Sequence, residues 1–261
     1  MNFLLKLRRE NRKNNNDSKP LYLKKRLQQK YPIKRAYNSI IPLKIFQTWH
    51  TKDLPPNMKK AVEFVKSLHP AFEHYLFDDN DCREYLKNNY SEIHVQAFDK
   101  LIPGAYKADF WRYCVLYKEG GIYMDIKYIP QNGFRLIQLT EKEHFVLDQD
   151  NHGIYNALMV CKPGNPILLK AIRQVIRNIK MKYYGNNVLE PTGPHLLAQF
   201  FPSFVKNNLD MKHENYHHVN KYITFNNIIV LKMYSNYYDE MGKYQKNSHY
   251  DVLWNERKIY A

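Results

Sequence analysis

One stretch, residues 105–130, constrains the fold more than any other part of the chain. It reads AYKADFWRYCVLYKEGGIYMDIKYIP. Apolar and aromatic residues recur at helical spacing over residues 108–116, and Gly120 and Gly121 follow, where a left-handed helix end favours glycine. Residues 122–129 are rich in β-branched and aromatic side chains. The stretch therefore predicts a helix, a double-glycine stop and a buried strand.

Four charged residues in this stretch are the candidates for chemistry. Asp125 lies inside the predicted strand, and an ionised carboxylate buried without a partner is strongly destabilising. It must be paired, bind a cation, or lie at a strand end and face a ligand. Strand alternation places Asp125 and Lys127 on one face. Asp109 and Arg112 are three apart on the predicted helix and also share a face, where an exposed pair would contribute only about 0.3–0.5 kcal/mol.

The spacing of these residues resembles a known family, the glycosyltransferases whose sugar-binding region carries a DxD motif. That family includes the yeast initiating α-1,6-mannosyltransferase and many bacterial capsular-polysaccharide transferases. Its members show Ala or Ser, then Asp, two residues and Arg, and further on Gly-Gly-x-Tyr-x-Asp-x-Asp. The matching positions are Ala108, Asp109, Arg112, Gly120, Gly121, Tyr123 and Asp125. Lys127 stands where the family usually has its second Asp, and the resemblance extends from about residue 41 to the C-terminus.

The resemblance implies an α/β, GT-A-like nucleotide-binding fold with a mixed, mainly parallel sheet flanked by helices. Alternating strands and helices point to the same architecture. It also implies transfer of a hexose from a UDP-sugar or GDP-mannose to a glycan, lipid or protein acceptor, with retention of configuration. Asp109 and Arg112 are then expected to hold donor-sugar hydroxyls, with Tyr123 and Asp125 also in the donor site. In relatives, the second Asp coordinates Mn²⁺ or Mg²⁺, which neutralises the leaving diphosphate.

Lys127 leaves three interpretations open. In the first, the lysine itself is the phosphate-binding point charge, and transfer is independent of metal. Alternatively, a metal site is retained, with Asp125 and His249 as its candidate ligands. The third interpretation is a non-catalytic nucleotide-sugar or carbohydrate-binding module whose DxD motif has degenerated. His249 is the best C-terminal candidate for a place near metal or diphosphate, although a single histidine is more often a structural hydrogen-bonding group.

Other matches to the family are weaker. Three residues of the predicted first strand are expected to contact the nucleotide: Gln47, Thr48 and Trp49. Trp49 either stacks on the base or belongs to the core. Asn156 resembles a family position at the sugar or acceptor edge, and residues 192–194 form either an acceptor loop or only a turn. A second acidic string at residues 148–150 lacks the Gly-Gly-x-Tyr context, so we interpret it as a solvated loop.

The positive charge of the chain is concentrated at its start. The net charge is +15, and the first 35 residues hold twelve Lys or Arg and only two acids. We therefore divide the chain into a basic arm, residues 1–36, disordered or helical, and a GT-A glycosyltransferase domain, residues 37–261. The arm suits an anionic membrane surface or is simply solvated. Nucleic acid is not an expected partner, because no binding motif flanks the arm.

The cysteines and the apolar segments favour a cytoplasmic location, with peripheral membrane attachment as an option. Cys82, Cys114 and Cys161 are far apart and are expected to be reduced core thiols. Residues 3–5 are too short for a signal-peptide core. No apolar run approaches the roughly 20 residues that span a bilayer.

The remaining elements are predicted from periodicity and turn residues. The predicted strands are residues 44–49, 72–77, 144–147, 154–161 and 223–231. The predicted helices are residues 21–29, one entered at residues 54–57, 81–89, 91–101, 167–182 and 195–200.

Overall fold

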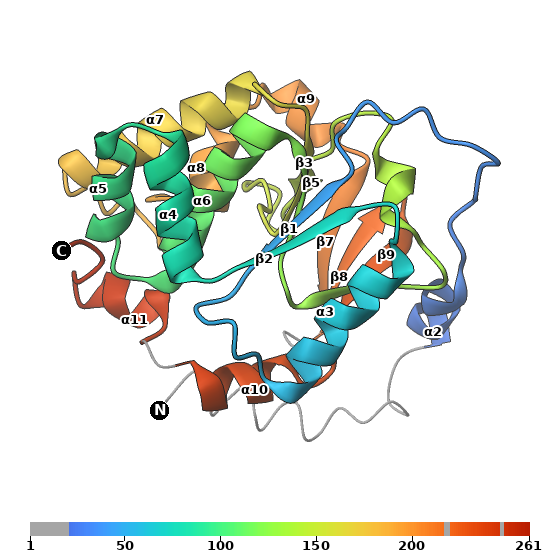
Figure 1. Ribbon diagram of the computed structural model, residues 1–261. Helices are drawn as coiled ribbons and strands as arrows, with labels where there is room; N and C mark the ends of the chain where they lie inside the picture. Colours follow the sequence, from blue (N-terminus) through green and yellow to red (C-terminus); the bar gives the residue numbers. More distant parts are fainter. Residues whose placement is uncertain (1–20, 217–219, 246–247) are drawn as a thin grey trace.

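The computed structural model describes residues 21–216, 220–245 and 248–261, which fold around two β-sheets (Figure 1). The first sheet has the strand order β2 (Glu73–Phe77), β1 (Lys44–Thr48), β3 (Gly121–Met124) and β6 (Leu158–Cys161). The second has the order β4 (Tyr128–Pro130), β9 (Ile228–Met233), β8 (Asn220–Phe225), β7 (Met211–Tyr216) and β5 (Val146–Leu147).

The helices of the described residues lie around these sheets, and all but four of them were expected. They are α2 (Leu21–Gln28), α3 (Pro56–Leu68), α4 (Asp79–Asn89), α5 (Glu92–Lys100), α6 (Gly104–Glu119), the 3₁₀ helix η2 (Leu136–Leu139), α7 (Pro166–Lys180), α8 (Pro194–Ala198), α9 (Ser203–Asn207), α10 (Tyr237–Tyr244) and α11 (Tyr250–Asn255). The sequence predicted α2 to α8 to within a few residues. It did not predict the short helices η2, α9, α10 and α11.

The first sheet is mixed and mainly parallel, as predicted. Strand β1 pairs in parallel with both β2 and β3, whereas β6 pairs antiparallel with β3. Helices α4, α5, α6 and α7 gather on one side of this sheet, and the second sheet lies on the other (Figure 1). The α/β class is therefore confirmed. The second sheet was not predicted, and most of its pairings are antiparallel.

Strand alternation explains the two main hydrophobic clusters. Phe46 and Tyr123 point to the helical side of the first sheet and pack with Trp111 of α6. Their neighbours Ile45 and Ile122 point to the opposite face and pack with the second sheet. Because successive residues of a strand face opposite sides, apolar residues at consecutive positions indicate a sheet covered on both faces.

The prediction of one continuous strand over residues 122–129 is wrong. Strand β3 ends at Met124, and a turn follows in which Tyr128 N–H donates to the Asp125 carbonyl over 3.0 Å. The chain then leaves the first sheet and joins the second as β4, which pairs with β9. Asp125 thus lies at a strand end, one of the positions considered for it, and Lys127 lies in the crossover between the sheets.

The predicted strand over residues 223–231 is also wrong, because it spans a hairpin. Strands β8 and β9 pair Phe225 with Ile228, so the loop between them is Asn226 and Asn227. Both asparagines have positive φ, 47° and 64°. Asparagine tolerates this left-handed region better than most residues, and two such residues form the tight turn that suits a hairpin.

Residues 21–36 of the predicted basic arm lie against the second sheet. Leu23 is buried, and Arg26 donates to both Glu214 carboxylate oxygens over 2.7 and 2.9 Å. The Tyr31 ring stacks on Phe225 with centroids 4.7 Å apart. Residues 1–20 lie outside the described residues, so the arm and the domain boundary at residue 37 stay predictions.

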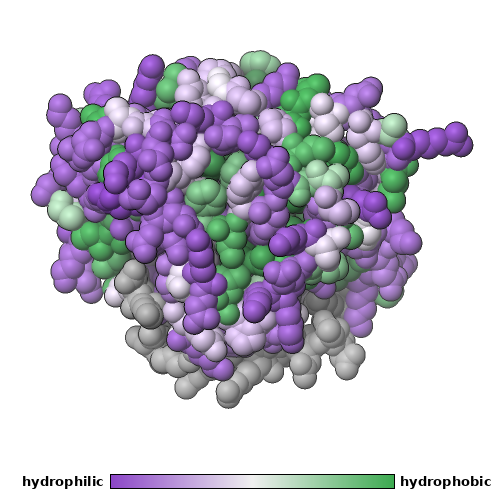
Figure 2. All heavy atoms as spheres, in the orientation of Figure 1, coloured by the Kyte–Doolittle hydropathy of each residue, from purple (hydrophilic) through white to green (hydrophobic). Residues whose placement is uncertain are grey.

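Two further expectations concern cysteines and apolar segments. Cys82, Cys114 and Cys161 are buried and free of disulfides, as expected. None of the helices in the described part of the chain is both long and apolar enough to cross a bilayer. The face in Figure 2 is largely hydrophilic, with hydrophobic side chains gathered near its centre, over β1 and β2.

Candidate active site

Helix α6 and the two glycines after it fix the position of the site. The helix ends at Gly120, whose φ is +64°, and Gly121 has φ +104°. A Cβ on Gly120 would lie 2.6 Å from Pro163 Cδ, and one on Gly121 would lie 2.8 Å from the Lys44 carbonyl oxygen. Only glycine meets both the positive φ and the close approach. The helix is thereby held against β3, with Asp109 and Arg112 turned toward the end of that strand.

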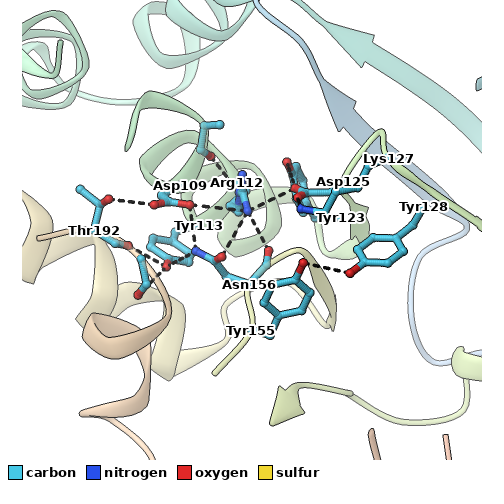
Figure 3. Close-up of polar contacts among 12 residues, drawn as sticks. Asp109, Arg112, Tyr113, Tyr123, Asp125, Lys127, Tyr128, Tyr155, Asn156 and Thr192 are labelled. Atoms are coloured by element: carbon cyan, nitrogen blue, oxygen red, sulfur yellow. Dashed lines mark hydrogen bonds and ion pairs between the residues drawn. The ribbon is translucent and has the colours of Figure 1, made fainter. Parts of the chain in front are cut away.

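Arg112 joins the two aspartates that the sequence singled out (Figure 3). Its Nη1 lies 3.5 Å from Asp109 Oδ1 and 3.4 Å from Asp125 Oδ1. The same nitrogen donates to the Asn156 carbonyl over 2.9 Å, and the guanidinium lies 4.3 Å from the Tyr123 ring centroid. Arg112 is only 6% exposed and Asp109 8% exposed. Asp109 and Arg112 are therefore part of a buried network and do not form an exposed surface ion pair.

Asp109 is held by donors from two other segments. Its Oδ1 accepts from Asn156 Nδ2 over 2.9 Å, and its Oδ2 accepts from Thr192 Oγ1 over 2.8 Å. Asn156 Nδ2 also donates to the Tyr113 hydroxyl, which donates to the Thr192 carbonyl. Burial raises the pKa of the Asp109 carboxyl, although Arg112 opposes this. Asp109 does not line the cavity described below, so what it does in the structure is to orient Arg112.

Asp125 is paired with Lys127, which replaces the usual second aspartate. Lys127 Nζ donates to Asp125 Oδ2 over 2.5 Å, and the Tyr123 hydroxyl donates to Oδ1 over 2.9 Å. The ammonium lies 5.4 and 5.5 Å from the Tyr128 and Tyr155 ring centroids, and those two hydroxyls are 2.9 Å apart. The crossover turn, not strand alternation, brings Lys127 onto Asp125.

The partners of this pair stabilise both charges. Burial opposes ionisation of Asp125, but Lys127 and Arg112 hold its pKa below the ordinary value. Burial likewise opposes the charge on Lys127, yet Asp125 raises the pKa of the ammonium. Both groups are therefore charged at neutral pH. A buried carboxylate and ammonium in contact favour each other's ionised form.

A cavity of about 290 Å³ opens beside this network. It lies at the carboxyl ends of β1 and β3, where ligands bind in parallel α/β sheets. Its volume is close to the lower end of the roughly 300–1,000 Å³ that is usual for ligand pockets. The charged side chains that line it are Asp79, Arg112, Asp125, Lys127 and Lys221. The aromatic side chains that line it are Trp49, His50, Tyr123, Tyr237, Tyr238, His249 and Tyr250.

The predicted nucleotide contacts divide between the cavity and the core. Thr48 and Trp49 line the cavity. Gln47 does not: it is fully buried, and its Oε1 accepts from His74 Nε2 over 2.8 Å. Asn156 is buried in the Asp109 network instead of lining the cavity. Strand alternation explains why Gln47 is buried, because Gln47 shares a face of β1 with Ile45.

His249 lines the cavity at the start of α11. Its Nδ1 accepts from the Asp251 N–H over 3.3 Å, and burial lowers the pKa of its imidazole. The second acidic string has structural partners. Asp148 accepts from His213 Nδ1 over 2.7 Å, and Asp150 accepts from His195 Nε2 over 2.6 Å. The prediction of a solvated loop is therefore wrong for Asp148, which is buried, whereas Gln149 and Asp150 are exposed.

The side chains present do not fit the Mn²⁺ or Mg²⁺ ion that the resemblance implies. Hard divalent cations require several oxygen ligands. Both Asp125 oxygens already bind protein donors, and one of those donors is an ammonium that would repel a cation. No cluster of three or more His, Cys, Asp or Glu suited to a metal occurs within residues 21–216, 220–245 and 248–261. Metal binding by Asp125 and His249 stays a prediction.

Sequence reasoning missed the cavity wall formed by β8, α10 and α11. Lys221 comes from β8, and Tyr237 and Tyr238 from α10. Tyr250 begins α11. The Asn226-Asn227 pair was the available signal for the β8–β9 hairpin. The Tyr237-Tyr238 pair carried none, because two adjacent tyrosines do not indicate a helix facing a ligand.

The fold and the cavity together define an α/β ligand-binding domain whose polar groups gather at the carboxyl ends of parallel strands. Residues 55–146 match the family described as "Glycosyltransferase sugar-binding region containing DXD motif". This segment contains Asp109, Arg112, Asp125 and Lys127. Over this segment the chain is similar to that family of glycosyltransferases, and the named relatives support the family that the motif spacing predicted.

Similar proteins include several fungal mannosyltransferases. Inositol phosphoceramide mannosyltransferase 3 of Schizosaccharomyces pombe is 31% identical over 172 residues, which cover 65% of this chain and 47% of the relative. The initiation-specific alpha-1,6-mannosyltransferase of the same yeast is 28% identical over 197 residues, 63% of this chain and 48% of the relative. The chain thus spans about half the length of these two relatives.

A solved structure titled "PaToxG Glycosyltransferase" is also similar in fold. It shows 17% identity and a TM-score of 0.46, and the match covers 63% of this chain and 69% of that one.

Proposed function

We propose that this chain transfers a hexose from a nucleotide-sugar donor to a hydroxyl group of a glycan, lipid or protein acceptor. The observation that carries the proposal is the buried Asp109–Arg112–Asp125 network, which lies beside a cavity and within the segment that matches the family. The relatives' names favour mannose, so GDP-mannose is the first donor to test and UDP-sugars follow.

In this proposal, Arg112 and Asp125 bind the donor sugar. Arg112 is positioned by Asp109 and by the Asn156 carbonyl, so its fork is fixed before the donor arrives. The carboxylate of Asp125 has further acceptor capacity for a sugar or ribose hydroxyl beside its two protein donors. Thr48 and Trp49, at the end of β1, are placed to meet the nucleotide. Asp109 acts through Arg112 and is a positioning residue.

The proposed transfer proceeds with retention on one face of the sugar. The bond between the anomeric carbon and the diphosphate oxygen breaks, and the electron pair leaves on the nucleoside diphosphate. The acceptor oxygen bonds to the same face of that carbon, and its proton passes to the departing phosphate oxygen. Asp125 is engaged by Tyr123 and Lys127, which argues against its acting as a covalent nucleophile. Fixed positive groups would stabilise the charge that develops on the leaving group.

The experiment measures nucleoside diphosphate released from a panel of GDP- and UDP-sugars, with simple glycosides and lipid-linked acceptors present. We expect turnover of at least one donor and a loss of about 100-fold or more in Asp125→Asn, the range for removing one preorganised electrostatic group. Asp99→Asn is the matched control, because Asp99 is an exposed carboxylate paired with Arg83 and does not line the cavity.

The rival function is a non-catalytic nucleotide-sugar or carbohydrate-binding module, favoured by Lys127 at the usual second Asp. Donor binding without turnover across the panel would support that rival. If neither donor binding nor turnover is found, the transferase proposal is wrong.

The cytoplasmic location and the anionic membrane surface expected for the basic arm stay predictions. Deleting residues 1–20 and measuring attachment to anionic vesicles tests the membrane contact.

A further inference from the structure

The charged groups beside the cavity balance one another before any donor binds. Asp109 and Asp125 carry the two carboxylates, and Arg112 and Lys127 carry the two cations. Each carboxylate lies within 3.5 Å of a cation. A donor diphosphate brings further negative charge into this space, and a divalent metal would usually neutralise it. This network alone provides no excess of positive charge.

The missing charge is not readily supplied by a metal at Asp125. Lys127 Nζ occupies Oδ2, and the Tyr123 hydroxyl occupies Oδ1. Lys127 is itself held by two tyrosine rings, Tyr128 and Tyr155. Because these contacts fix the position of Lys127, we interpret the lysine as a functional part of the site and not as the result of a degenerated motif. A metal ion would have to displace the ammonium to reach the carboxylate.

A third cation reaches the cavity from the second sheet. Lys221 of β8 lines the cavity, and its Nζ lies 5.9 Å from the Tyr238 ring centroid. Across the described ranges, which omit residues 217–219 and 246–247, neither a hydrogen bond nor an ion pair involves the Lys221 side chain. Burial is the main cause that lowers the pKa of His249, which lines the same cavity; the charge of Asp251 opposes this and the charge of Lys221 adds to it. Lys221 is therefore a lining cation that forms no ion pair with a described carboxylate. Burial raises the pKa of the other lining carboxylate, Asp79, and the charge of Lys107 opposes this effect.

We propose that the donor diphosphate is bound without a divalent cation, by Lys127 and Lys221 together. This inference rests on the proposed transferase function. An ammonium has three N–H donors, and Lys127 uses one of them on Asp125, so it keeps donors for a phosphate oxygen. Lys221 adds the positive charge that the Asp125–Lys127 pair lacks. Lysine binds phosphate as a point charge and needs no fixed coordination geometry.

The first test measures binding of GDP, UDP and their monophosphates by calorimetry in excess EDTA. The wild-type chain is expected to bind one diphosphate in EDTA and to prefer it over its monophosphate. In Lys221→Gln, we expect diphosphate affinity to fall about tenfold, which corresponds to about 1.4 kcal/mol, while monophosphate affinity stays within about twofold. A purely structural role would weaken both nucleotides alike. Lys212→Gln is the matched control, because Lys212 is exposed on neighbouring β7 and does not line the cavity.

The second test restores the Asp-x-Asp pair. In Lys127→Asp, we expect Mn²⁺ to bind, with a paramagnetic resonance signal as readout, and to raise diphosphate affinity. In the wild-type chain, we expect no signal from bound Mn²⁺ and no effect of Mn²⁺ on diphosphate affinity. Lys127→Met removes the charge without adding a carboxylate, so it should bind the diphosphate weakly with or without Mn²⁺. Thermal unfolding of each variant checks that it folds, and Lys127→Met carries the test if Lys127→Asp does not fold.

The outcomes separate this inference from the proposed function. Diphosphate binding that requires Mn²⁺ in the wild-type chain overturns the metal-free site but leaves transfer possible through a metal. A Lys221→Gln variant with wild-type diphosphate affinity overturns the role of Lys221. Failure of every nucleotide and nucleotide sugar to bind, with and without Mn²⁺, overturns the transferase function itself.

Discussion

Removing Arg112 should destabilise the fold far more than removing an exposed arginine. In Arg112→Met, Asp109 and Asp125 lose a cation that lies 3.5 and 3.4 Å from their oxygens. The Asn156 carbonyl also loses its 2.9 Å donor. Methionine fills much of the space but carries no charge. Because breaking a buried ion network leaves an uncompensated buried charge, we expect a loss of about 3–5 kcal/mol in the free energy of unfolding at neutral pH.

The deficit should depend on pH with a definite sign. Burial already raises the pKa of Asp109 in the wild-type chain, and loss of Arg112 removes the main opposing effect. A carboxyl whose folded pKa lies above its unfolded value of about 3.9 binds protons more readily in the folded state. Its contribution to stability is present below that unfolded value and is lost as pH rises through the folded pKa. The deficit of Arg112→Met should therefore be small near about pH 4 and grow toward neutral pH.

Urea unfolding of the wild-type chain, Arg112→Met and Arg83→Met at about pH 4.5 and about pH 7.5 measures this difference. Arg83 is the control, because it forms a close pair with Asp99 while their side chains are 42% and 41% exposed. Such a pair contributes about 1 kcal/mol or less. If Arg112→Met loses no more stability than Arg83→Met at neutral pH, the network is not the buried unit described above.

Two further predictions concern backbone geometry and a second ion pair. Gly120→Ala should lose at least about 2 kcal/mol in urea unfolding, because its Cβ would meet Pro163 at a positive φ; Gly104→Ala, with open space at its Cβ, should not be destabilised. Asp210 is partly buried, but His144 and Lys142 lower the pKa of its carboxyl to about 2. Asp210→Asn should thus lose about 2 kcal/mol at neutral pH, and unfolding curves should converge with wild type as pH falls from about 4 toward 2.

The central stretch was predictable because its signals are local. The three-residue spacing of Asp109 and Arg112 and the double glycine fix a helix face and a helix end without reference to the rest of the fold. The strand pattern that follows did not predict where β3 ends. An unbroken run of β-branched and aromatic residues does not reveal that the chain changes sheets after Met124, since both halves of the run are buried strands.

The C-terminal wall of the cavity was less predictable for a physical reason. The turn between strands β8 and β9 uses asparagines in place of glycine, so periodicity alone merges β8 with β9. Lys221 became a candidate only when the structure placed β8 beside the cavity. Strand alternation places Thr48 and Gln47 on opposite faces of β1. Which of the two faces the cavity could not be predicted, because it depends on which face the second sheet covers.

The most direct measurement is a crystal structure of the chain soaked with GDP-mannose, and separately with a UDP-sugar, in the presence of EDTA. We predict that one donor is ordered in the cavity, with its hexose against Arg112 and Asp125 and its diphosphate against Lys127 and Lys221. An ordered donor elsewhere on the protein, or a cavity that stays empty with every donor, would contradict the assignment of this network to sugar transfer.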